Sequence, residues 1–160
     1  MRSKGFSLAE LFMASVIMLL VAAGSMTVYL LSYSGWRESS GLAALQRTGS
    51  MAMEKMVRGV RGNNEARRNG LREAKSFSIP NAGTILFTSG VDSVERRFYL
   101  SADKIIYRCG GGESTLAHDV DSLAFSKIAN KRIRIDVTLQ EEIKGKTISV
   151  NLESEVLIRN

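Results

Sequence analysis

The chain has 160 residues, a formal net charge of +6 at pH 7 and a hydrophobic content of 44%. This length allows one compact domain and leaves little room for a second. Cys109 is the only cysteine, which excludes an intramolecular disulfide and the disulfide-stabilised class of small secreted proteins. The positive charge is compatible with anionic lipid or nucleic acid as a partner, but it identifies neither.

A long apolar stretch lies near the amino terminus. From Leu11 to Leu31 there is no charged residue and no proline. At 1.5 Å per residue this stretch makes a helix of roughly 32 Å, which is long enough to cross a bilayer. Arg2 and Lys4 precede it, and the two charges that follow it, on Arg37 and Glu38, cancel. The positive-inside rule therefore predicts a single pass through the membrane, with the amino terminus in the cytoplasm and everything after Ser34 facing outward.

A cleaved secretory signal peptide is an alternative interpretation of the same stretch. It would place the cut at the small residues Val21, Ala22 and Ala23, after an apolar region from Leu11 to Leu20. The apolar run continues to Leu31, however, and a cleaved signal needs no apolar length beyond its cut site. A membrane anchor fits the pattern better.

Glu10 fits neither interpretation. A carboxylate at the edge of a hydrocarbon-buried helix costs about 2–3 kcal/mol unless another group neutralises it. The segment Gly5-Phe6-Ser7-Leu8-Ala9-Glu10, followed by the apolar run, resembles the class III signal of type IV pilins and type II secretion pseudopilins.

The resemblance implies a role for three residues. A prepilin peptidase would cut between Gly5 and Phe6 and methylate the new terminal amine of Phe6. Glu10 would attract the terminal amine of a neighbouring subunit during assembly. The implied partners are other pilins or pseudopilins in a hetero-oligomeric filament tip, the peptidase, the inner-membrane assembly platform and the lipid bilayer.

Helical spacing continues beyond the apolar stretch. Apolar residues recur three and four positions apart at Leu42, Leu45, Ala52, Met53, Met56, Val57 and Val60. The spacing predicts one helix from about Phe6 to about Arg61, stopped by the sequence Gly62-Asn63-Asn64. The expected organisation is a leader at 1–5, a transmembrane and assembly helix at 6–33, its amphipathic continuation at 34–62 and a β-rich head at 63–160.

The head has the alternating pattern of strands. We expect strands at Lys75–Ile79, Thr84–Thr88, Val94–Ser101, Lys104–Cys109, Leu123–Lys127, Arg132–Leu139 and Thr147–Ile158. Short connections at Ala102-Asp103 and Lys144-Gly145-Lys146 predict an antiparallel sheet built from hairpins. Leu116, Val120 and Leu123 are spaced four and three apart, which predicts a helical turn before the fifth strand of this series. The fold class is α+β and pilin-like, a long helix packed on an antiparallel sheet.

Several phrases of the head resemble minor pseudopilins of the J type and related minor pilins. They are Leu45-Gln46-Arg47, Phe98-Tyr99-Leu100, Ile105-Ile106-Tyr107-Arg108 and the run from Leu116-Ala117 through Val120 to Leu123-Ala124-Phe125. This resemblance implies a subunit that caps or primes a filament tip.

The sequence offers little for catalysis or metal binding. His118 lies beside Asp119 and Asp121, but no second histidine or paired cysteine completes a ligand set. Gly112-Glu113-Ser114 begins like a nucleophile elbow, yet Leu116 stands where the motif requires glycine. We therefore expect no catalytic residues, no metal and no cofactor, and a flexible turn at the glycine run Gly110–Gly112.

Basic residues concentrate after the long helix. Six cationic residues stand against two glutamates there: Arg58, Arg61, Arg67, Arg68, Arg72 and Lys75 against Glu65 and Glu73. Phosphate contacts require only cations, so this segment could hold nucleic acid, although no aromatic residues are interleaved for base stacking. A solvated or subunit-facing loop is the simpler interpretation.

The predicted function is that of a non-enzymatic minor pilin or pseudopilin, a subunit of a type II secretion pseudopilus or a type IV pilus. One alternative is a DNA-uptake minor pilin that uses the basic segment. Another is a single-pass, membrane-anchored binding protein that does not polymerise. An enzyme with an uncleaved anchor is a third.

Overall fold

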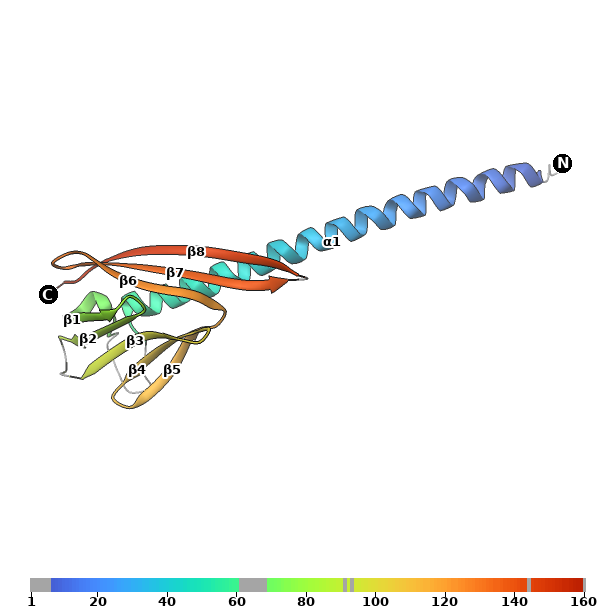
Figure 1. Cartoon of the computed structure of the whole chain (residues 1–160). Helices are drawn as coiled ribbons and strands as arrows, with labels where there is room; N and C mark the ends of the chain where they lie inside the picture. The colour runs from blue at the N-terminus through green and yellow to red at the C-terminus, as the bar shows by residue number, and fades with distance from the viewer. Residues whose placement is uncertain (1–6, 61–68, 91, 93, 144, 160) are drawn as a thin grey trace, which may run out of the picture. The chain divides into compact units, whose positions relative to one another are not determined.

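The computed structural model describes residues 7–60, 69–90, 92, 94–143 and 145–159. One long helix, α1 (Leu8–Arg58), is followed by a short 3-10 helix, η1 (Leu71–Glu73), and by eight strands (Figure 1). The strands are β1 (Ala74–Asn81), β2 (Thr84–Ser89), β3 (Glu95–Ser101), β4 (Lys104–Cys109), β5 (Gly112–Ala117), β6 (Val120–Ala129), β7 (Arg132–Ile143) and β8 (Lys146–Leu157). The α+β prediction is confirmed.

The chain divides into two compact units, residues 1–40 and residues 41–160. The first unit contains the amino-terminal part of α1. The second contains the last turns of α1 together with η1 and all of the strands.

Gly59 ends α1 earlier than the sequence suggested. It has a φ of +96°, and its N–H donates to the Lys55 carbonyl at 2.8 Å. A glycine in the left-handed region at this position closes a helix, because a residue with a Cβ is strained there. The stop predicted at Gly62 was therefore wrong by a turn.

The strands form two antiparallel sheets rather than one. The larger has the order β1-β2-β3-β4-β5 and the smaller the order β6-β7-β8. Within each sheet the strands pair in sequence order, so both sheets are meanders, and the connections at Ala102 and Gly145 turn with positive φ. The hairpin prediction is confirmed.

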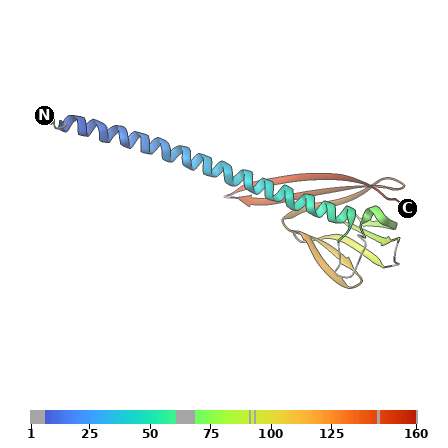
Figure 2. The ribbon, with the colours of Figure 1, turned by 180° about the vertical axis from the view of Figure 1, so that it is seen from behind.

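The last turns of α1 lie along the smaller sheet (Figures 1 and 2). Gly49 marks the close approach, since a Cβ added there would lie 2.7 Å from Leu139 Cδ1 and closer still to Leu152 Cδ1. On β7 the side chains of Ile133, Ile135, Val137 and Leu139 are fully buried, and they alternate with polar residues as predicted. Packing of these side chains holds this part of the helix on the sheet.

The turns of the larger sheet dock on β6. The Phe125 N–H donates to Ala82 O at 2.7 Å, and the Val120 N–H donates to Asp103 O at 3.0 Å. Within the larger sheet the ring of Phe87 stacks on that of Phe98, and the ring of Tyr107 lies tilted against Phe98. One core joins α1 and both sheets, and the same cluster contains buried residues from Leu45 to Ile158.

The helical turn predicted around Leu116 was wrong, because this region contains the ends of two strands. Leu116 and Ala117 end strand β5, which the sequence analysis missed, and Val120 begins β6. Asp119 reverses the chain between them with a φ of 60°. Leu116 and Val120 are buried from opposite sides of this turn, so their spacing of four reflects two strand ends and not a helical turn.

Candidate functional site

The amino-terminal part of α1 is uncovered along its whole described length. Every residue from Ser7 to Ser40 is exposed, including the large apolar side chains between Leu11 and Leu31. α1 contains a helical segment that is long and apolar enough to span a membrane. Exposed apolar surface on this scale is typical of a face that lipid or another protein covers.

Glu10 belongs to a reciprocal cap at the start of α1. The Ser7 N–H donates to Glu10 Oε2 at 2.9 Å, and the Glu10 N–H donates to Ser7 Oγ at 3.3 Å. This is a capping box, in which a serine and a glutamate three residues later satisfy each other's free backbone donors. The carboxylate also lies in the first turn of α1, near the positive end of the helix dipole.

The sequence analysis missed this local role of Glu10. The spacing of Ser7 and Glu10, just before an apolar run, is the usual signature of such a cap and could have revealed it. The two residues of the predicted processing site, Gly5 and Phe6, lie outside the described residues.

Two residues of the predicted basic segment, Arg58 and Arg72, line a cleft in the head, which we call the arginine cleft. Arg58 comes from the last turn of α1, Arg72 and Glu73 come from η1, and Arg159 follows β8. These four side chains line the cleft, and the Arg159 N–H donates to Arg72 O at 3.0 Å, which holds the carboxyl-terminal residues beside η1. Three guanidinium groups on one concave surface make it a candidate anion site.

The other basic residues of the predicted segment add no described side chain to the cleft. Lys75 is exposed on β1 and does not line the cleft, and Arg61, Arg67 and Arg68 lie outside the described residues. Arg159 was missed because it is far away in sequence and only the fold brings it to Arg72. Arg58 also pairs with Glu54 at 3.1 Å, an exposed pair that contributes little to stability.

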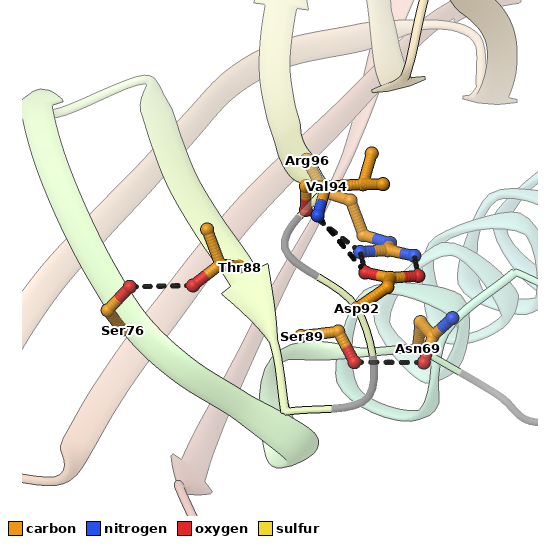
Figure 3. Close-up of polar contacts among 7 residues, drawn as sticks. All are labelled: Asn69, Ser76, Thr88, Ser89, Asp92, Val94 and Arg96. Atoms are coloured by element: carbon orange, nitrogen blue, oxygen red, sulfur yellow. Dashed lines mark hydrogen bonds and ion pairs between the residues drawn. The ribbon is translucent and has the colours of Figure 1, made fainter.

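An ion pair between buried Arg96 and partly exposed Asp92 closes the connection between β2 and β3 (Figure 3). The Arg96 side chain has no exposed surface, and its Nη1 and Nη2 atoms lie 2.6 and 2.7 Å from the two oxygens of Asp92. Nearby, Ser89 Oγ donates to Asn69 Oδ1 at 3.0 Å. The bidentate hydrogen bond from Arg96 holds the pKa of the Asp92 carboxyl below its ordinary value. We assign this pair to fold stability.

Among the described residues there is no group of three or more His, Cys, Asp and Glu side chains placed to hold a metal ion. His118, Asp119 and Asp121 are all exposed at the turn between β5 and β6. The glycine run that follows β4 turns the chain into β5, with positive φ at Gly110 and Gly111.

Comparison of the chain with protein-family models, with curated proteins and with solved structures gives no match.

Proposed function

We propose that the chain is a non-enzymatic minor subunit of a type IV filament machine, either a type II secretion pseudopilus or a type IV pilus. One observation supports this most. The carboxyl-terminal part of the 51-residue helix α1 packs in the core of a β-rich head. Every residue of its amino-terminal part, from Leu8 to Ser40, is exposed. Such a subunit would be stored in the bilayer and would exchange lipid contacts for helix-to-helix contacts on assembly.

Processing by a prepilin peptidase is the first consequence of the proposal. The mature chain would begin at Phe6, with Gly5 as the last residue of the leader. Intact-mass measurement of the protein from membranes should then show loss of residues 1–5 and gain of one methyl group. A full-length, unmethylated chain would contradict the proposal and favour a simple anchor.

A variant pair tests the cleavage site itself. Gly5→Leu should block the cut, since a side chain keeps the extended backbone from approaching the protease closely. Ser3→Leu places the same side chain elsewhere in the leader and should leave processing intact. Equal processing of both variants would count against a role for Gly5.

The capping box makes a sharp test of Glu10 possible. Glutamine also serves at the third position of a capping box, so Glu10→Gln keeps the cap and removes the charge. Glu10→Val removes both. If Glu10 attracts the terminal amine of a neighbour, both variants should insert in the membrane and both should be depleted from filaments.

Pull-down of sheared filaments measures this incorporation. Ser7→Ala weakens the cap but keeps the charge of Glu10, and it should assemble nearly as well as the unaltered chain. If Glu10→Gln assembled normally while Ser7→Ala did not, Glu10 would act only as a helix cap, and the proposed attraction would be excluded.

The arginine cleft favours a second candidate function, DNA uptake by a minor pilin. Arg58, Arg72 and Arg159 could contact phosphates of the DNA backbone without reading its sequence. Binding should then fall steeply as salt is added. Arg72→Ala should weaken binding in a gel-shift assay more than Lys75→Ala, which removes a charge outside the cleft. No retention of DNA at low salt would exclude this function.

A further inference from the structure

Three amphipathic aromatic side chains follow one another on one face of α1. The rings of Tyr29 and Tyr33 stack with centroids 6.2 Å apart, and those of Tyr33 and Trp36 with centroids 6.3 Å apart. The Arg37 guanidinium carbon lies 5.7 Å from the centre of the Tyr33 ring. We call Tyr29, Tyr33 and Trp36 the aromatic ladder.

The place of the ladder on the helix is distinctive. Before Tyr29 the first unit contains no tyrosine and no tryptophan, and Trp36 is the only tryptophan of the chain. The ladder begins where the charge-free stretch from Leu11 to Leu31 ends, and the first charged residue beyond that stretch is Arg37. Rings with one polar atom prefer the boundary between hydrocarbon and headgroups, where the ring and the polar atom are both satisfied.

The ladder also fits this boundary in length. Seven residues separate Tyr29 from Trp36, a rise of about 10 Å along the helix. A headgroup layer is about 5–8 Å thick on each side of a hydrocarbon core of about 30 Å. The ladder therefore spans the end of the hydrocarbon and the whole headgroup layer, with Arg37 at the level of the lipid phosphates.

We propose that the aromatic ladder and Arg37 form a lipid-headgroup anchor that sets the depth of α1 in the outer leaflet. The stacked rings occupy the interface, and the Arg37 guanidinium, held over Tyr33, binds phospholipid phosphate. The anchor requires a membrane-spanning helix, as the proposed function does, but it requires neither cleavage nor assembly.

The anchor fixes the position of Glu10 as well. Twenty-three residues separate Glu10 from Tyr33, a rise of about 34 Å, or roughly 32 Å at an average tilt of about 20°. With Tyr33 in the outer interface, Glu10 reaches the inner edge of a hydrocarbon core of about 30 Å. There its carboxylate accepts the Ser7 N–H within the capping box while the subunit is stored in the bilayer.

Depth-dependent quenching of tryptophan fluorescence tests the anchor in the full chain. The protein is placed in phosphatidylcholine and phosphatidylglycerol vesicles that carry bromine at a shallow, middle or terminal position of the acyl chains. Trp36 should be quenched most by the shallow bromine. Two further single-tryptophan proteins, Tyr33→Trp with Trp36→Tyr and Tyr29→Trp with Trp36→Tyr, should report sites deeper by about 4 and 10 Å, at 1.5 Å per residue.

The control is Leu157→Trp in the Trp36→Tyr chain. Leu157 is exposed on β8, so its replacement should not be quenched by lipid bromine at any depth. Two results would overturn the proposal. One is Trp36 quenched by aqueous acrylamide and by no lipid bromine. The other is quenching that changes with the ratio of protein to lipid, which would assign the ladder to contact with a second copy.

The anchor and the proposed function fail separately in these experiments. Uncleaved Gly5→Leu protein should give the same depth profile as the unaltered chain, because the ladder acts on the stored subunit. If the native chain were unprocessed but gave the expected depth profile, the anchor would be supported and the proposed filament function would be contradicted.

Discussion

Arg96 is the largest fully buried side chain among the described residues. A buried guanidinium is tolerated only when a carboxylate compensates it, and Asp92 does so with two short hydrogen bonds. The pair closes the connection between β2 and β3, so it stabilises one end of the larger sheet.

Asp92→Asn should lower the free energy of unfolding by about 2 kcal/mol, because it leaves a buried charge poorly paired. The folded state lowers the pKa of Asp92, so the stabilisation is complete above the ordinary aspartate pKa of about 4 and is lost as pH falls through the lowered value. The difference between the two proteins should therefore shrink in acid. Denaturation in detergent at several pH values measures it.

Glu95→Gln is the matched control, since its contact with Arg97 is 4.0 Å long and exposed. It should change stability by less than about 0.5 kcal/mol. A constant difference between Asp92→Asn and the unaltered protein from neutral to acidic pH would contradict the assignment.

Some of these residues could be recognised from the sequence and others could not. Glu10 stood out because a charge beside an apolar run has an energetic cost that needs an explanation. Its partner in the cap, Ser7, was overlooked although the spacing was visible. Arg96 and Asp92 were not recognised at all, because burial of an arginine depends on strands that pair far from it.

At the scale of elements, the sequence predicted what local periodicity controls. The alternation on β7 and the apolar stripe around Met53 gave the correct type of element. Strand β5 has four exposed residues out of six, so it carries almost no alternating pattern and was missed. The division into two sheets depends on the docking of turns on β6 and leaves no trace in local periodicity.

The approach of α1 to β7 and β8 gives a prediction at this scale. Gly49→Val should destabilise the head by about 2 kcal/mol, because the added carbons meet Leu139 and Leu152 before the helix can move away. Ser50→Val is the control, since valine meets no packed side chain at the exposed Ser50 and serine and valine have similar helix propensities. Circular dichroism during thermal unfolding compares them, and equal losses would refute the close approach.

At the scale of the whole molecule, the two units differ in the burial of their apolar residues. The described residues of unit 1 contribute no buried residue, while the core of unit 2 runs from Leu45 to Ile158 and belongs to that unit alone. The sequence predicted a transmembrane and assembly helix at 6–33 from its charge-free stretch. It did not locate the arginine cleft, whose residues come from three separate parts of the chain.

A chain that starts at Gly41 should therefore fold without unit 1. It should be monomeric in water without detergent, and its thermal unfolding midpoint should lie within a few degrees of that of the head in the full chain, because no core residue is removed. Aggregation or a molten spectrum would show that residues 1–40 contribute to the core.

The glycines that flank residues 61–68 have a practical consequence. A Cβ on Gly59 would collide with the backbone at Gly70, and a Cβ on Gly70 would collide with the backbone at Gly59. The two segments of the chain are therefore in close contact at these glycines. Replacing either glycine with a larger residue would therefore force these two segments of the chain apart at the edge of the core.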